Sequence, residues 1–158
     1  MNRHHYGLIL AGGRGTRFWP LSRRRTAKQV LKVMGERSLI QGTVDRLAPV
    51  IPPERIWILT NDHLRDVIVR QLPEVPRRQV LAEPAQRNTA PAIGLAAQIL
   101  QSLDPDAVMG VFPADHVVKH ETAYRSVVRA ALKSAAEPNA AIPPQKMKPL
   151  LSDDLRRG

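Results

Sequence analysis

The side chains best suited to chemistry lie directly after the first apolar segment, residues 6–10. They are three glycines and seven cations with no acid among them: Gly12, Gly13, Gly15, Arg14, Arg17, Arg23, Arg24, Arg25, Lys28 and Lys32. Glycine lets the backbone approach a ligand closely because it has no Cβ. Exposed N–H groups beside cations favour phosphate oxygens. The stretch therefore predicts a polyphosphate site, with Arg17 and Lys28 holding it from two sides.

Two better-known phosphate loops do not fit this stretch. A dinucleotide fingerprint needs a third glycine where Phe18 stands, and a Walker loop needs a Gly-Lys-Ser/Thr sequence that is absent. A tight structural turn beside a solvated basic face remains the alternative interpretation.

A second candidate is Asp115 in the segment Pro113-Ala114-Asp115-His116. It follows an apolar run, and a carboxylate oxygen is the kind of ligand that Mg²⁺ prefers. A nucleoside triphosphate reacts as its magnesium complex, so Asp115 is a candidate metal ligand. The alternative is an aspartate that only caps a helix or shapes a turn, and His116 is expected to pack rather than to ligate.

A third candidate is the polar segment 83–89, EPAQRNT. Guanine presents two donors on its pairing edge, N1–H and the exocyclic amine, and a carboxylate can accept both. Glu83 therefore suits guanine better than adenine or uracil. The alternative is that Glu83 pairs with an arginine and that Asn88 or Thr89 only caps the next helix.

Alternating apolar runs and helical periodicity predict the elements that must position these residues. Strands are expected at 6–10, 56–60, 79–82 and 107–112, and helices at 39–47, 63–72, 91–103 and 121–136, with Ser38 as a helix cap. This order predicts an α/β fold, a Rossmann-like and mostly parallel sheet with helices on both faces. Each candidate segment follows a strand, so all three should meet at the carboxyl edge, where such sheets bind ligands.

Composition narrows the function classes. The chain has 158 residues and a net charge of +10, with 15 Lys/Arg against 6 Asp/Glu in residues 1–79 and 9 against 8 in residues 80–158. The excess in the half that holds the glycines favours an anionic ligand. Aromatic residues make up 4%, and no nucleic-acid motif is present, so nucleic acid is not an expected partner.

The sequence also limits the redox chemistry and the location that we expect. The absence of cysteine excludes disulfides and Cys-based sites. No apolar run is long enough to span a membrane, and no secretory leader is recognisable, so a cytoplasmic protein is expected. His4 and His5 are expected to lie in a disordered N-terminus.

Three segments carry a family resemblance: LAGGRGTRFWPLSRRRTAKQVL (10–31), AEPAQRNTAPAIGLAA (82–97) and VFPADHVV (111–118). The first resembles the signature of sugar-1-phosphate nucleotidylyltransferases, and its tryptophan with Ser-Arg and Lys-Gln is similar to the mannose-1-phosphate guanylyltransferase branch. The other two resemble that family's second and third signatures, in the same order. The resemblance covers residues 6 to 136.

This resemblance implies a nucleotide-diphospho-sugar transferase fold that makes GDP-mannose and pyrophosphate from GTP and mannose 1-phosphate with Mg²⁺. By residue, it implies that Arg17 and Lys28 act on the departing pyrophosphate and that Asp115 holds the metal. The implied nucleotide-binding residues are Leu10, Ala11, Gly12, Gly13, Gly15, Thr16, Glu83, Asn88 and Thr89.

The chain departs from the family pattern in two places. Ala27 stands where proline usually precedes Lys-Gln, and the sugar-binding segment and second metal aspartate expected after residue 136 are absent. We therefore expect residues 1–137 to form the nucleotide-binding part, residues 138–158 to be a divergent Pro-rich, disordered tail, and the fold to be C-terminally incomplete. Turnover is expected to be impaired, with a catalytically inactive GTP-binding module as the alternative. The unpaired sheet edge would favour a homo-oligomer.

Overall fold

The computed structural model of the chain describes residues 2–12, 36–83 and 89–137. Its strands are β1 (His5–Leu10), β2 (Ile56–Asn61), β3 (Val80–Glu83) and β4 (Val108–Pro113). Its α-helices are α1 (Leu39–Leu47), α2 (Asp62–Gln71), α3 (Thr89–Leu103) and α4 (Glu121–Ala135), and two 3₁₀ turns are η3 (Pro53–Arg55) and η4 (Arg77–Gln79). The predicted alternation of strands and helices is confirmed.

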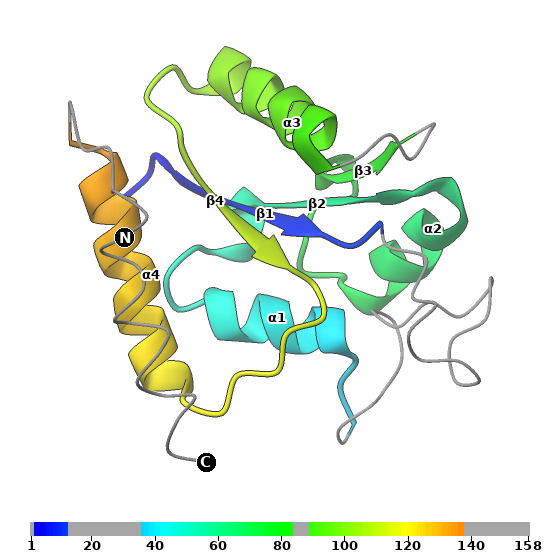
Figure 1. The fold of residues 1–158 in the computed structure, drawn as a ribbon. Helices are drawn as coiled ribbons and strands as arrows, with labels where there is room; N and C mark the ends of the chain where they lie inside the picture. Colours follow the sequence, from blue (N-terminus) through cyan, green and yellow to red (C-terminus); the bar gives the residue numbers. More distant parts are fainter. Residues whose placement is uncertain (1, 13–35, 84–88, 138–158) are drawn as a thin grey trace.

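The described strands form one parallel sheet in the order β3-β2-β1-β4. Along the chain, β2 is added next to β1 and β3 next to β2. The chain then crosses back, and β4 pairs with the other side of β1. This reversal creates a switch point between β1 and β4, where open α/β sheets leave a crevice at their carboxyl edge. Figure 1 shows α3 on one side of the sheet and α1 on the other.

Two apolar clusters explain why both faces of the sheet are covered. One cluster joins Ile9, Ile58 and Phe112 to buried side chains of α1, α2 and α4. The other joins Leu8 and Trp57 to one stripe of α3, formed by Ala92, Ala96 and Leu100. Because successive residues of a strand point to opposite faces, the all-apolar runs of β1 and β2 serve both clusters at once.

Helix starts follow the expected chemistry, with small shifts in position. Ser38 caps α1 as predicted: its Oγ accepts from the Gln41 amide at 3.4 Å, and the Ser38 amide donates to Gln41 Oε1 at 2.9 Å. Helix α2 begins at Asp62, one residue earlier than expected, because Asn61 Oδ1 accepts from the Leu64 amide at 3.0 Å. Helix α3 begins at Thr89 rather than near residue 91, so Thr89 is its first helical residue and not its cap.

Two glycines face each other between β1 and β4, where Gly7 pairs with Gly110. The ring of Phe112 fills the space that a side chain at Gly110 would take and lies in ordinary van der Waals contact with the position of one at Gly7. An added Cβ on Gly110 would lie 2.7 Å from Phe112 Cζ, and one on Gly7 would lie 3.7 Å from Phe112 Cε2. Glycine at this pair therefore lets an aromatic ring pack directly on the sheet.

The expectation of a disordered N-terminus at His4 and His5 is wrong. His5 is the first residue of β1, and the His4 ring nitrogen Nδ1 lies 2.9 Å from the Asp104 carboxylate. Tyr6 Oη donates to the same carboxylate at 3.0 Å. A polar partner about a hundred residues away thus holds the start of the chain, and local sequence gives no sign of it.

These contacts shift ionisation at the amino edge of the sheet. Burial opposes the charge of Asp104, but the hydrogen bonds from His4 and Tyr6 outweigh it and hold the pKa of the Asp104 carboxyl below its usual value. Burial, helped by Asp104, raises the pKa of the Tyr6 phenol. Burial, helped by the nearby Arg55 cation, lowers the pKa of His5. His4, Asp104 and Asp106 have ligand atoms within 4.8 Å of one another, and the Asp104 carboxylate is already engaged by the His4 ring, the Tyr6 hydroxyl and the Asp106 amide.

Within the described ranges, no helix is both long enough and apolar enough to cross a bilayer.

Candidate functional site

The carboxyl ends of all four strands meet at one edge of the sheet, as predicted. Leu10 at the end of β1 pairs with Pro113 at the end of β4. At the other side, Asn61 at the end of β2 pairs with Glu83 at the end of β3. This register places the described members of the three candidate segments along the same edge.

Gly12 and Glu83 come together at this edge although 71 positions separate them in the chain. The Glu83 carboxylate oxygen Oε2 lies 3.8 Å from the position that a Cβ on Gly12 would take. Glu83 is half-buried and is the last residue of β3. The predicted strand ended one residue earlier, at position 82. The glycine turn and the carboxylate therefore border the same space.

Two residues of β2 hold the start of the glycine turn, and the sequence reasoning missed both. Thr60 is fully buried, and its Oγ1 donates to the Ala11 carbonyl at 3.3 Å. Asn61 Nδ2 donates to the Gly12 carbonyl at 3.5 Å, while its Oδ1 caps α2. The Ala11 amide donates to the Leu59 carbonyl at 2.7 Å. The Asn three residues before Leu64 is a recognisable cap signal, but the contact with Gly12 is tertiary.

The segment after β4 places Asp115 beside the same turn. The Ala114 amide donates to the Leu10 carbonyl at 3.1 Å, which continues the pairing of β4 with β1. Ala114 is 1% exposed, whereas the next residue, Asp115, is half-buried. Asp115 therefore follows the end of β4, and Ala11 and Gly12 follow the end of the neighbouring β1. The two segments lie on opposite sides of the switch point.

Helix α1 contacts this segment through two buried polar residues that sequence reasoning did not single out. Arg46 Nη2 donates to the His116 carbonyl at 3.1 Å and to Thr43 Oγ1 at 3.1 Å. The Arg46 guanidinium also lies 5.5 Å from the ring centroid of Tyr124 on α4. Burial raises the pKa of the Tyr124 phenol, and the positive charge of Arg46 opposes this rise.

Several predicted site residues lie outside the described residues: Gly13, Gly15, Thr16, Arg17, Lys28 and Asn88. Thr89 is placed only as the first residue of α3. The structure therefore brings Leu10, Ala11, Gly12, Glu83 and Asp115 to one edge. The binding and catalytic roles of all the predicted site residues stay predictions.

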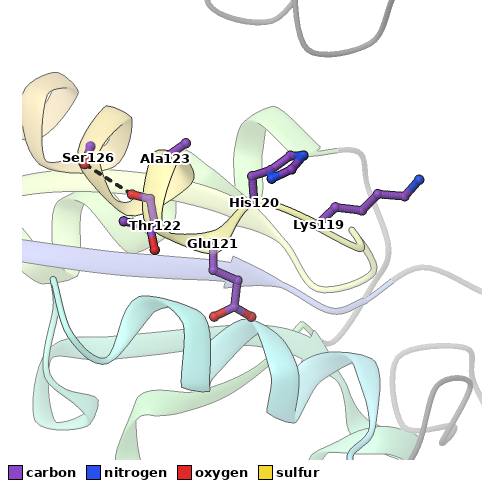
Figure 2. A pocket seen from close by; sticks show the side chains of 6 residues that line it. All are labelled: Lys119, His120, Glu121, Thr122, Ala123 and Ser126. Atoms are coloured by element: carbon purple, nitrogen blue, oxygen red, sulfur yellow. Dashed lines mark hydrogen bonds between the residues drawn. The ribbon is translucent and has the colours of Figure 1, made fainter. Parts of the chain in front are cut away.

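An open hollow lies beyond this edge, at the beginning of α4. Figure 2 shows Glu121 extending towards α1, and Lys119 and His120 extending the other way along the preceding loop. Glu121 is engaged by Arg125 at 2.6 Å, and Ser126 Oγ donates to the Thr122 carbonyl at 3.1 Å. The residues that line the hollow are Lys119, His120, Glu121, Thr122, Ala123 and Ser126, and none of them is a predicted site residue.

The geometry of the edge suits a nucleotide. A glycine turn without side-chain bulk can approach phosphates, and Glu83 offers a carboxylate to the donors of a base next to it. Asp115 offers an oxygen ligand of the kind that a magnesium complex of a triphosphate needs. The three groups lie along the carboxyl edge of a parallel sheet, and Gly12 and Asp115 flank its switch point, the usual ligand position in this architecture.

Comparison with known proteins agrees with this geometry. The family described as Nucleotidyl transferase matches residues 6–150. A mannose-1-phosphate guanylyltransferase of Sinorhizobium fredii is 40% identical over 132 residues, which cover 82% of this chain and 26% of the relative. The mannose-1-phosphate guanylyltransferase RfbM of Salmonella typhimurium is 43% identical over 133 residues, 82% of this chain and 28% of the relative.

A solved structure supports the same assignment. A Thermus thermophilus protein described as a mannose-1-phosphate geranyltransferase superposes with a TM-score of 0.71 at 36% identity, over 83% of this chain and 38% of that one. The chain thus spans about a quarter of the length of the curated relatives it matches. The resemblance read from the three sequence segments is confirmed, and the chain belongs to the nucleotidyl transferase family.

Proposed function

We propose that this chain is the nucleotide-binding part of a mannose-1-phosphate guanylyltransferase and that it binds GTP at the carboxyl edge of its sheet. The observation that carries the proposal is the position of the Glu83 carboxylate beside Gly12. A guanine base seated there could donate both N1–H and its amine to Glu83, while its phosphates follow the glycine turn. The names of the relatives at about 40% identity support guanosine and mannose as the two halves of the product.

In the proposed reaction, a phosphate oxygen of mannose 1-phosphate attacks the α-phosphorus of GTP in line. The bond from the α-phosphorus to its bridging oxygen breaks, and pyrophosphate leaves. Backbone amides from Gly12 to Thr16 would bind the phosphates, and Arg17 and Lys28 would neutralise the charge of the departing pyrophosphate. No covalent intermediate on the protein is needed, so rate acceleration would come from positioning and charge stabilisation.

Asp115 is chemically suited to bind magnesium, because Mg²⁺ prefers carboxylate oxygen ligands. Its carboxylate is half-buried at the switch point, on backbone fixed by the Ala114–Leu10 hydrogen bond. When bound, Mg²⁺ would neutralise phosphate charge and orient the triphosphate. The residues of this chain would hold that complex between Asp115 and the glycine turn.

The chain matches only about a quarter of the length of its relatives. This motivates a second candidate function, a GTP-binding module without catalysis. The relatives are about four times as long as the matched segment, so groups that select and hold the sugar phosphate can lie outside it. Strand β4 is an edge strand in the described sheet, and Val111 on it is 38% exposed. Pairing of this edge with another copy is part of the proposal, because a free strand edge favours association.

The two candidates are separated by measuring pyrophosphate release from GTP and mannose 1-phosphate with the 158-residue chain. Release that depends on both substrates and is lost in the Lys28→Ala variant would support the enzyme. Binding of Mg-GTP with no release at high protein concentration would support the module. Failure to bind GTP would overturn both.

A further inference from the structure

Arg46 is a buried cation between α1, the segment after β4 and α4. It is 6% exposed, and its Nε–H is buried without a hydrogen-bond partner among the described residues. Among the residues that the structure describes, the ion pairs do not include Arg46. Burying a guanidinium without a carboxylate costs free energy. The side chain must therefore be explained by the bonds that it does make.

Those bonds point to the backbone on both sides of Asp115. Arg46 Nη2 donates to the carbonyl of His116, the residue after Asp115, at 3.1 Å. It also donates to Thr43 Oγ1. This hydroxyl donates to the Leu39 carbonyl at 3.0 Å and also lies 3.5 Å from the carbonyl of Ala114, the residue before Asp115. Thr43 is 1% exposed, so water does not compete for these groups.

The opposite side of the same backbone is fixed by β1, through the bond from the Ala114 amide to the Leu10 carbonyl. The segment is thus held from the sheet on one side and from α1 on the other. Tyr124 packs against the Arg46 guanidinium, and Arg125 Nε donates to the Arg46 carbonyl at 3.0 Å. Helix α4 therefore limits the movement of Arg46 as well.

We propose that Arg46, supported by Thr43, is a positioning residue that fixes the backbone around Asp115 and so sets the affinity of the site for Mg²⁺. The inference rests on the proposed function, in which Asp115 holds the metal of Mg-GTP. Arg46 does not touch the metal or the nucleotide in this account. It acts by limiting the positions that the Asp115 carboxylate can take.

The test measures GTP binding by the 158-residue chain in a Mg²⁺ titration and again in EDTA. Loss of groups that orient a metal ligand typically lowers metal affinity by about 10- to 100-fold. We expect Arg46→Met to raise the Mg²⁺ concentration for half-maximal GTP binding by about tenfold, with the affinity in EDTA unchanged. Arg46→Lys keeps the charge but not the planar donor geometry, so it should give a smaller rise.

If Arg46→Met does not fold, two variants of Thr43 still test the positioning role. Thr43→Val has nearly the same shape and lacks the hydroxyl, whereas Thr43→Ser keeps it. We expect Thr43→Val to raise the Mg²⁺ requirement and Thr43→Ser to leave it close to that of the unmodified chain.

Arg129→Met is the matched control. Arg129 Nη2 also donates to a backbone carbonyl at 3.0 Å, but that carbonyl belongs to Pro49, away from the segment after β4. We expect no change in its Mg²⁺ requirement.

Asp115→Asn separates failure of this inference from failure of the proposed function. If Asp115→Asn raises the Mg²⁺ requirement and the Arg46 and Thr43 variants do not, the positioning role is wrong and the metal role of Asp115 stands. If the Arg46 variants weaken GTP binding equally in Mg²⁺ and EDTA, Arg46 is only structural. An unchanged Mg²⁺ requirement in Asp115→Asn would overturn both.

Discussion

The carboxylate of Glu83 lies beside Gly12, with 3.8 Å between Oε2 and the position of a Cβ on that glycine. Glu83 ends β3 and Gly12 lies in the turn after β1, and β2 separates these two strands in the sheet. Asn61 at the end of β2 bonds to the Gly12 carbonyl and pairs with Glu83 in the ladder, so it links the two. Strand register therefore sets the proposed base-reading group and the proposed phosphate turn in fixed relation to each other.

Gly12→Ala should separate ligand access from stability. Within the described part of the chain, the added methyl would meet no atom closer than 3.8 Å, so we expect the free energy of unfolding to change by no more than about 1 kcal/mol. The same methyl would stand where the phosphates approach, so GTP affinity should fall at least about tenfold, or about 1.4 kcal/mol. Urea unfolding and calorimetric titration check the two parts.

The control for this variant is Gly94→Ala on α3, where an added Cβ has no neighbour within 4 Å. It should stabilise the chain by about 0.5–1 kcal/mol through helix propensity and leave GTP binding unchanged. Equal GTP affinities in Gly12→Ala and the unmodified chain would contradict the assigned phosphate turn.

Glu83→Gln should reduce discrimination among purine nucleotides. Glutamine keeps the size of the side chain but replaces one acceptor oxygen with a donor, so it cannot accept both guanine donors. Hydrogen bonds to a charged group are worth about 1.5–3 kcal/mol, so GTP affinity should fall by about 10- to 100-fold. ITP lacks the exocyclic amine, so the preference for GTP over ITP should shrink in the variant.

The exposed Glu54 in η3 provides the control, as Glu54→Gln should leave both nucleotides unaffected. A Glu83→Gln variant that keeps the full preference for GTP over ITP would show that Glu83 does not contact the base.

Much of the fold could be predicted from the sequence because β1 and β2 each contain a continuous apolar run and the helices carry apolar residues at helical spacing. The convergence of Gly12, Glu83 and Asp115 followed from parallel topology alone. What could not be predicted depends on contacts between distant residues. Helical periodicity does not reveal the bond from Arg46 to the His116 carbonyl, because the two residues are 70 positions apart.

The N-terminus shows the same limit. A polar start with two histidines is typical of a frayed end, and the Asp104 carboxylate that holds His4 comes from the turn before β4. Boundary shifts of one or two residues, as at Glu83 and Thr89, have a local cause. Helix and strand ends depend on cap and ladder hydrogen bonds that periodicity does not resolve.

Gly110→Ala should destabilise the fold by overpacking. A Cβ there would lie 2.7 Å from Phe112 Cζ and 2.9 Å from Cε2, closer than unstrained contacts allow. We expect a loss of about 1–3 kcal/mol in the free energy of unfolding, measured in urea. Phe112→Leu should recover part of this loss in the double variant, because the two effects share one contact. Additive losses in the double variant would contradict the assigned clash.

His5 should make stability fall as the solution becomes acidic. Burial, followed by the charge of Arg55, lowers its pKa below the ordinary value of 6.5, so the unfolded chain binds the proton more readily. The free energy of unfolding should therefore decrease as pH falls from 6.5 towards the folded-state pKa.

Replacement of His5 removes this contribution, so His5→Gln should show a smaller difference in unfolding free energy between pH 7.5 and pH 5, roughly the range over which histidine titrates. The exposed His63→Gln on α2 is the control, measured by urea unfolding at both pH values. A pH dependence that is unchanged in His5→Gln would refute this assignment.

We propose that the edge formed by Gly12, Glu83 and Asp115 is a guanosine triphosphate site. Its most direct test is calorimetric titration of the 158-residue chain with GTP and with ATP in excess Mg²⁺. We predict one site that binds GTP at least about tenfold more tightly than ATP, a difference of about 1.4 kcal/mol. Equal affinities for the two nucleotides, or no binding of GTP, would contradict the claim.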